Sequence, residues 1–367
     1  MRDEKLLAIL QLQKATGIGD ILAKRLIAAV GDVEQIFKEK ATNLQKINRI
    51  GKYTLQHLFD KKLYSSAEKE LLYIREKKIK FTYFLENTYP QNLIHCIDGP
   101  ILLFQEGKID FTNKRIISIV GTRNITSYGR DFCNQLIDEL AVYDPIIISG
   151  FAYGVDIFAH KTAVKNKLQT IAVLAHGFDQ IYPKSHKKYI HQLNEKGGFL
   201  TEFWHDENPL RKNFLKRNRI VAGVSKATVI IESAKKGGSL VTADIANSYN
   251  RDVFALSGRA TDIYSKGCNH LIKNNQAHLL TSAKDIVQML NWDLEEKKPL
   301  PKQQELFISL NKKEQKIYDY LHQKGKQVLD VIALDCAIPT YILAPVLLQM
   351  ELKGLVRPLP GKLFEIK

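Results

Sequence analysis

Six short apolar runs, separated by stretches of helical character, constrain the fold of this 367-residue chain more than any other feature. The runs are residues 116–120, 146–148, 171–174, 199–200, 229–231 and 253–256. A strand that is apolar on both faces has to be covered on both sides. Strands that alternate with helices therefore predict an α/β fold, built as an extended Rossmann-like, doubly wound and mainly parallel sheet.

The runs occupy only the middle of the chain, which predicts three domains. Residues 1–79 have the pattern of short amphipathic helices and predict a small helical domain of the helix-hairpin-helix or SAM-like type. Residues 80–292 form the Rossmann-like domain, and the charged, proline-containing residues 293–304 form a linker. Residues 305–367 predict three helices and a β-hairpin, which is a winged-helix-like arrangement.

The charge of the chain favours a polyanionic partner. The net charge is +15, and the basic residues cluster: residues 211–219 hold five cations and no acid, and residues 184–188 add three lysines and a histidine. A uniform excess would serve only solubility, whereas clustered charge indicates a binding surface.

Compartment and membrane association follow from composition. No apolar run is long enough to span a membrane, and the N-terminus lacks a signal-peptide pattern. The four cysteines are far apart and form no CxxC pair, which favours a reducing compartment. We therefore expect a cytoplasmic protein without a membrane partner.

Glycine and serine turns follow several of the strands, at the edge of the sheet where ligands bind in open α/β folds. Such turns feed helix N-termini, where backbone N–H groups and the helix dipole favour an anion. Each turn alone is also ordinary strand-end chemistry, but several at one edge predict a phosphate-binding face. The residues concerned are Gly121, Arg123, Ser149, Gly150, Gly237, Gly238 and Ser239.

The first turn differs from a dinucleotide fingerprint, because Arg123 stands where the second glycine of GxGxxG would be. An arginine there blocks close approach of a pyrophosphate but can bind one phosphate with its forked donors. This argues against NAD and for separate phosphates along a strand.

The basic segment at residues 211–219 is expected to begin a helix and to add cations and an aromatic ring to the phosphate-binding face. Phe214 stands beside Arg217, Asn218 and Arg219, which suits base stacking combined with backbone binding. The alternative is that Phe214 and Ile220 belong to the core and the arginines form a solvated face.

Catalytic readings find little support. Asp156 and His160 are four residues apart, but no third ligand is spaced near them. Asp156 is well placed as a helix N-cap, and His160 as a hydrogen-bonding partner of a neighbouring strand. No HExxH, Walker or GxSxG motif is present, so we expect no enzyme, no metal and no cofactor. The rival is a nucleotide-binding or nucleotide-hydrolysing protein of the LOG-like Rossmann group, although residues 236–244 lack most of its PGGxGTxxE motif.

About half of the chain closely resembles the DNA-processing protein A family (DprA/Smf). The resemblance lies in an ordered series of motifs between residues 89 and 280. They include Val120-Gly121-Thr122-Arg123 and Gly154-Val155-Asp156, and the most telling are Phe214 with Arg217-Asn218-Arg219-Ile220 and Gly238-Ser239-Leu240-Val241-Thr242-Ala243.

The resemblance implies a homodimer that binds single-stranded DNA without sequence preference, protects incoming DNA in natural transformation and helps to load RecA recombinase. It implies no catalytic activity. Gly237 stands where relatives more often have serine, but glycine should keep the turn. Lys184 is included among the candidate phosphate-binding residues on its charge alone. Tyr153 stands where relatives often have a charged or long polar residue, so it either stacks on a base or packs against the protein. The positions carried over from the family motifs are Gly121, Arg123, Ser149, Gly150, Arg217, Asn218, Arg219, Gly238 and Ser239.

The two ends of the chain remain open to more than one reading. Gly17 and Gly19 resemble a helix-hairpin-helix turn, and Arg49 interrupts a second copy, so at most one hairpin is expected to be intact. A plain turn between two helices explains these glycines equally well. At the other end, the expected recognition helix, residues 341–350, has no cation and contains Pro345. We therefore expect this domain to contact protein rather than read a DNA groove.

Overall fold

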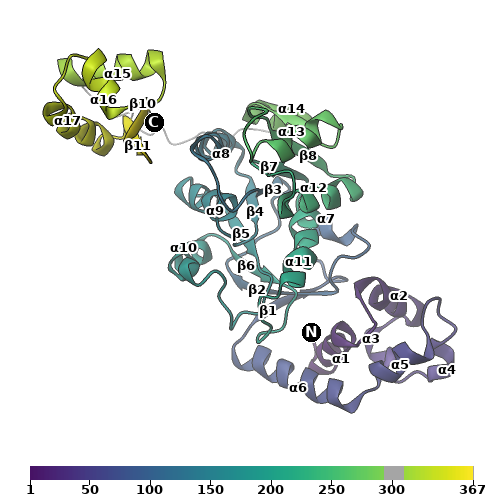
Figure 1. Cartoon of the computed structure of the whole chain (residues 1–367). Helices are drawn as coiled ribbons and strands as arrows, with labels where there is room; N and C mark the ends of the chain where they lie inside the picture. Colours follow the sequence, from purple (N-terminus) through teal and green to yellow (C-terminus); the bar gives the residue numbers. More distant parts are fainter. Residues whose placement is uncertain (293–309, 367) are drawn as a thin grey trace. The chain divides into compact units, whose positions relative to one another are not determined.

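The computed structural model describes residues 1–292 and 310–366, which form two compact units (Figure 1). The first unit contains the N-terminal helices and the central sheet, and the second contains the small C-terminal domain. The predicted linker, 293–304, lies outside the described residues. Among the described residues, no single helix is long and apolar enough to cross a membrane.

The central sheet has nine strands, and all six predicted strands are confirmed. Three further strands, β1, β2 and β9, were not predicted, because β1 and β2 carry charged residues and β9 is short. In chain order the strands are β1 (Lys80–Tyr83), β2 (Leu102–Gly107), β3 (Ile116–Val120), β4 (Ile146–Ser149), β5 (Thr170–Val173), β6 (Gly198–Thr201), β7 (Ala227–Ile230), β8 (Asp252–Leu256) and β9 (His278–Leu280).

The order of the strands makes the sheet doubly wound. It runs β1-β2-β6-β5-β4-β3-β7-β8-β9, so the chain winds outward from β3 on one side through β4, β5 and β6. It then returns to the other side of β3 and winds outward through β7, β8 and β9. Strands β3 to β9 pair in parallel, and β2 runs in the opposite direction, antiparallel to its neighbours β1 and β6. The edge beside β3, where the winding reverses, is where ligands bind in such sheets.

Helices cover both faces of the sheet, as the apolar runs require. Alternate residues of β3 show the division: Ile117 and Ile119 pack into one buried cluster, and Ile116 and Val120 into another. The first cluster includes residues of α8 (Ser127–Leu140), α9 (Val155–Lys165) and α14 (Ala283–Met289). The second includes residues of α7 (Gln91–Ile94), α11 (Arg211–Val224), α12 (Gly238–Ser248) and α13 (Lys266–Lys273). The 3-10 helices η1 (Ala141–Tyr143) and η2 (Lys184–Tyr189) and helix α10 (Ile190–Glu195) complete this part of the chain.

The N-terminal helices contain two turns with a positive φ at corresponding residues, so Arg49 takes a backbone conformation similar to that of Gly17 in the first copy. Gly17 has φ +82°, and Arg49 takes the same left-handed conformation at φ +68° in the second copy. Ile18 and Ile50, which follow, are buried in the helical core and hold both turns in place. The helices are α1 (Asp3–Lys14), α2 (Asp20–Val30), α3 (Val33–Ile36), α4 (Ala41–Leu44), α5 (Lys52–Leu58) and α6 (Lys61–Glu76).

A buried ion pair joins these helices to the sheet domain. The guanidinium of Arg219, on α11, contacts Glu202 Oε2 at 2.6 Å and Asp20 Oδ2 at 3.2 Å. Its Nη1 donates to the carbonyl oxygen of Asp98 at 2.5 Å. Asp20 begins α2 and also accepts a hydrogen bond from the backbone of Ile101. The three charged side chains are almost fully buried and leave no room for an external anion at Arg219.

The C-terminal unit has the predicted winged-helix arrangement of three helices and a hairpin. Helix α15 begins with a capping box between Asn311 and Glu314, and Lys353 donates to Glu314 at 2.6 Å. Its elements are α15 (Lys312–Lys324), β10 (Gln327–Val328), α16 (Leu329–Asp335), α17 (Thr340–Leu352), β11 (Val356–Leu359) and β12 (Leu363–Ile366).

Arg219→Ala should destabilise the first unit by about 3–5 kcal/mol, because it leaves buried Asp20 without its ion-pair partner and buried Glu202 with only the half-exposed Lys216. Urea-induced unfolding followed by circular dichroism measures this change. Lys216→Ala is the matched control: Lys216 also contacts Glu202, at 2.8 Å, but is half exposed, so its loss should cost less than about 1 kcal/mol. Wild-type stability of Arg219→Ala would contradict the assignment of Arg219 to the fold.

Candidate nucleic-acid interface

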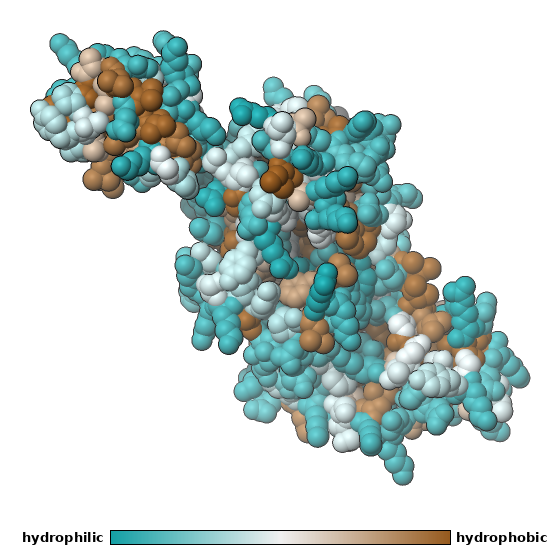
Figure 2. Space-filling view, viewed as in Figure 1, coloured by the Kyte–Doolittle hydropathy of each residue, from teal (hydrophilic) through white to brown (hydrophobic). Residues whose placement is uncertain are grey.

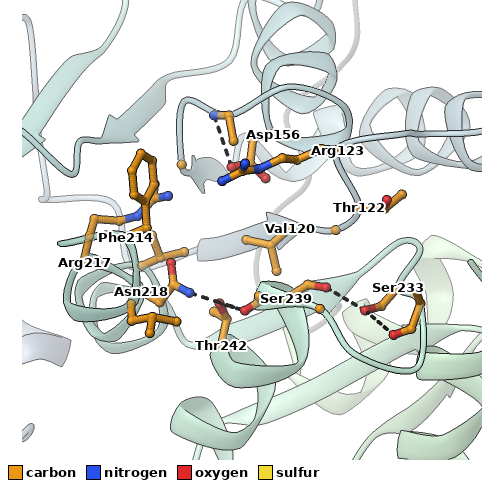
Figure 3. A pocket seen from close by; sticks show the side chains of 18 of the residues that line it. Val120, Thr122, Arg123, Asp156, Phe214, Arg217, Asn218, Ser233, Ser239 and Thr242 are labelled. Atoms are coloured by element: carbon orange, nitrogen blue, oxygen red, sulfur yellow. Dashed lines mark hydrogen bonds between the residues drawn. The ribbon is translucent and has the colours of Figure 1, made fainter. Parts of the chain in front are cut away.

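A pocket of about 710 Å³ opens at the carboxyl ends of β3, β4 and β7, beside the point where the winding of the sheet reverses (Figure 3). Its walls come from turns that leave the strands and from the exposed side of α11. The residues that line it are in four segments, 120–123, 150–156, 209–221 and 233–242, together with Tyr182 and Tyr264.

Arg217 forms the floor of this pocket. Its side chain is 95% buried, and Nη1 donates to the carbonyl oxygen of Val173 in β5 at 2.6 Å. Its buried Nε has no hydrogen-bond partner among the described residues. Burial lowers the pKa of Arg217, but a guanidinium keeps its proton in proteins. The floor therefore presents a fixed positive charge with donor capacity that the protein itself does not satisfy.

Gly150 makes this position possible for Arg217. A Cβ atom at residue 150 would collide with Arg217 Nη1 on one side and with Asp156 Oδ2 on the other. Burial raises the pKa of Asp156, while Arg217 and Arg123 oppose the rise. The glycine was predicted to bring its backbone close to phosphate, but here it gives space to the protein's own charged pair.

Asp156 and His160 have structural partners. Gly154, not Asp156, is the N-cap of α9, so that detail of the prediction is wrong, and Asp156 lies in the first turn instead. His160 bridges Thr170 of β5 and the carbonyl oxygen of Gly150, each at 2.6 Å, which confirms the predicted strand contact. Burial lowers the pKa of His160 to about 4, so the ring is neutral at physiological pH and holds the loop of Gly150.

Aromatic and cationic side chains stand at the mouth of the pocket. Phe214 lines the pocket and is half-buried, which separates it from Ile220, a residue of the core. The Arg123 guanidinium lies 5.7 Å from the centre of the Phe214 ring, and the Tyr182 ring meets Phe214 edge-on at 5.4 Å. Figure 3 shows Arg123 projecting into the pocket opposite Phe214. This pairing suits a base held against the ring with its phosphate near Arg123.

The N-terminus of α12 faces the same space. Gly237 is the N-cap, without a side-chain cap, and Gly238 opens the helix. Ser239 Oγ donates to Ser233 Oγ at 2.9 Å, and Asn218 Nδ2 donates to the Gly238 carbonyl oxygen at 3.3 Å. The Leu240 N–H donates to the Gly237 carbonyl oxygen at 3.1 Å, so the N–H groups of Gly238 and Ser239 are the ones that this helix start offers to an anion.

Three predicted residues do not line the pocket. Ser149 is fully buried and donates to the carbonyl oxygen of Ile119 at 2.6 Å, and Arg219 is held in the ion pair described above. Lys184 is exposed at the start of η2, two residues after Tyr182. Tyr153 is also outside, with its hydroxyl 3.0 Å from Ser185 Oγ and its ring against His186. The other predicted residues do line the pocket: Gly121, Arg123, Gly150, Phe214, Arg217, Asn218, Gly237, Gly238 and Ser239.

Several pocket residues were not predicted as part of the site. Tyr182 precedes a proline and Arg211 lies in the basic segment, but no sequence pattern indicated that either residue lines the pocket. Lys236 precedes the glycine turn and also lines the space. The pocket lining thus includes four cations, Arg123, Arg211, Arg217 and Lys236, and one carboxylate, that of Asp156. Within the described ranges, no group of three or more His, Cys, Asp or Glu side chains could hold a metal ion.

Comparison with protein families gives two matches. The model of DNA recombination-mediator protein A matches residues 80–291, and the DprA winged helix domain matches residues 301–362. The first match contains every residue of the pocket, and the second contains most of the C-terminal unit.

Relatives and solved structures agree with these matches. The DprA protein of Streptococcus pneumoniae is 36% identical over 57% of this chain and 74% of its own length. The DprA protein of Bacillus subtilis is 35% identical over 62% of this chain and 76% of its own length. Protein Smf of Escherichia coli is 34% identical over 74% of each chain.

The S. pneumoniae DprA structure superimposes with a TM-score of 0.66 at 28% identity, covering 78% of this chain and 98% of its own. DprA of Helicobacter pylori, whose structure was described for its single-stranded DNA binding mode, has a TM-score of 0.52 at 31% identity, with coverages of 58% and 97%. The chain belongs to the DprA/Smf family of DNA recombination-mediator proteins.

Proposed function

We propose that this protein binds single-stranded DNA in the pocket at the carboxyl ends of β3, β4 and β7, without preference for sequence. The observation that carries the proposal is the buried guanidinium of Arg217 at the floor, whose Nε has no hydrogen-bond partner among the described residues, in a pocket that Arg123 and the N-terminus of α12 also line. Three anion-binding groups that converge on one space suit a phosphate.

The mouth of the pocket favours a polynucleotide over a single phosphate. The Phe214 ring lies beside the Tyr182 ring and the Arg123 guanidinium, and Lys184, two residues after Tyr182, is an exposed cation. Alternation of aromatic rings and cations is the arrangement that tracks an unpaired strand. Contacts to phosphates and ring faces carry no sequence information, which supports binding without preference.

Membership of the family extends the proposal beyond the pocket. It supports a protein that protects incoming single-stranded DNA in natural transformation, acts as a homodimer and helps to load RecA recombinase onto the strand. We also infer that the protein works in the cytoplasm, where the four free, buried cysteines would stay reduced. The site supports binding rather than catalysis, since Asp156 and His160 serve the fold of the floor.

Affinity should climb with the length of the DNA over several nucleotides. Fluorescence anisotropy with a labelled oligothymidylate, competed by unlabelled oligomers of increasing length and by thymidine monophosphate, measures this. The longer competitors should displace the probe at much lower concentration than the mononucleotide, because they engage the aromatic mouth and Lys184 as well as the floor. Displacement by mononucleotide as strong as by oligomer would favour the LOG-like nucleotide-binding alternative.

Arg123→Ala and Arg217→Met should each weaken binding of single-stranded DNA. Each removes one phosphate contact, so the slope of log affinity against log salt concentration should shallow by roughly 0.7. Filter-binding titrations at several salt concentrations give the slope, and the methionine keeps most of the volume of the buried Arg217 side chain. Lys69→Ala, an exposed cation of α6, is the control and should bind as the wild type does. Unchanged slopes in both pocket variants would reject the two contacts.

Phe214→Ala should cost roughly 1–3 kcal/mol of binding free energy, the range for a stacked base. Phe214→Trp should restore most of the loss, because it keeps an aromatic face. Both affinities are referred to the folded fraction, measured by circular dichroism. Equal affinity of the alanine variant per folded molecule would assign Phe214 to packing against Tyr182 alone.

A further inference from the structure

The helix in the recognition position of the winged helix, α17, carries an apolar stripe on its exposed side. Tyr341, Pro345, Leu348 and Leu352 follow one another at intervals of four, three and four residues, and all four are exposed. This alternation keeps side chains on one side of a helix over successive turns and is the spacing of helix–helix seams. We call these four residues the α17 seam. Other residues of α17 pack into the core of the domain: Leu343, Leu347 and Met350.

The exposure of the seam is large for apolar side chains. Tyr341 is 77% exposed, Leu352 82% and Leu348 57%. A shallow apolar pocket adjoins the N-terminal end of α17, where Pro339 and Thr340 line it together with Leu334 of α16, itself 79% exposed. Apolar side chains gather over α16 on the visible face of this domain (Figure 2). Apolar residues grouped in this way mark a surface that contacts another molecule.

The charge around the seam selects the kind of partner. Residues 327–352 contain no lysine, arginine or histidine, although the whole chain has 54 lysines and arginines. The charged residues of this segment are three exposed carboxylates, Asp330, Asp335 and Glu351, and the lysine that follows it, Lys353, is paired with Glu314 at 2.6 Å. Such a surface repels phosphates, so the helix that would enter a DNA groove in a winged helix is unsuited to one. It attracts lysine and arginine side chains instead.

We propose that the α17 seam binds an amphipathic helix of a partner protein, with apolar residues at three- and four-residue spacing and lysine or arginine beside them. The pocket at Leu334 would take an apolar side chain from the end of that helix. This function is separate from DNA binding, because the seam and the pocket of the sheet domain lie in different units of the chain.

Two other occupants fit less well. A second copy of the seam would bring no cation from residues 327–352 to pair with the carboxylates of the first copy. A membrane surface with anionic lipids would be repelled by the same groups. The pair α16 and α17 reaches the apolar length of a membrane span only when joined across a bend of 110°.

The experiment uses the full-length protein and labelled synthetic helices about three heptads long. One peptide has leucines at seam spacing flanked by lysines, a second has glutamates in place of the lysines, and a third is a scrambled form of the first. We expect saturable binding of the lysine peptide with micromolar affinity, at least tenfold weaker for the glutamate and scrambled peptides. The variant with Leu348→Glu and Leu352→Glu should lose at least tenfold in affinity for the lysine peptide.

Leu72→Glu is the matched control, because Leu72 is 67% exposed on α6 and lies outside the seam. It should bind the lysine peptide as the wild type does, and all variants should keep the wild-type melting temperature. Equal binding of the scrambled peptide, or no loss in the double variant, would overturn the proposal. So would dimerisation in sedimentation that the double variant abolishes, or binding of phosphatidylcholine vesicles in place of the peptide. DNA binding, measured in parallel, reports separately on the pocket.

Discussion

The positive charge of Arg217, buried where the winding of the sheet reverses, is the interaction on which the rest of the site depends. It is held by the carbonyl oxygen of Val173, lies beside Asp156, and fits only because residue 150 has no side chain. Burying a guanidinium costs free energy that one carbonyl and one nearby carboxylate do not fully offset. In the function proposed above, a phosphate group would supply the missing partner of this charge.

The residues around Arg217 hold its charge in position. His160 is neutral and fixes the loop of Gly150, and the Arg219 ion pair fixes α11, the helix that carries both Phe214 and Arg217. Because Arg219 reaches Asp20, the N-terminal helices help to hold the helix that forms one wall of the pocket. The three residues Arg217, Asn218 and Arg219 are adjacent in sequence yet have different roles, since a helix turns each of them in another direction.

Much of the fold was predictable because it depends on local patterns. Continuous apolar runs specify strands covered on both sides, and the glycine turns after them specify helix starts at one edge. Residues were misassigned where partners distant in sequence decide their role. Arg219 and Ser149 are residue types that often bind phosphate. Here Arg219 pairs with Glu202 and Asp20, and Ser149 donates to the carbonyl oxygen of Ile119. Arg49 was expected to break the second hairpin, but Ile50, buried in the helical core, holds the turn in its left-handed conformation.

The amino-acid sequence by itself determined the alternation of strands and helices, the basic character of the chain and the set of motifs that mark the family. Those properties follow from periodicity, composition and the order of residues along the chain. Only the tertiary structure decided which cations line the pocket and which are neutralised inside the protein. It also showed which side of α17 the domain core covers. The physical reason is that burial and pairing are set by the strand order, which brings residues 98, 202 and 219 to one place and residues 123, 150 and 217 to another.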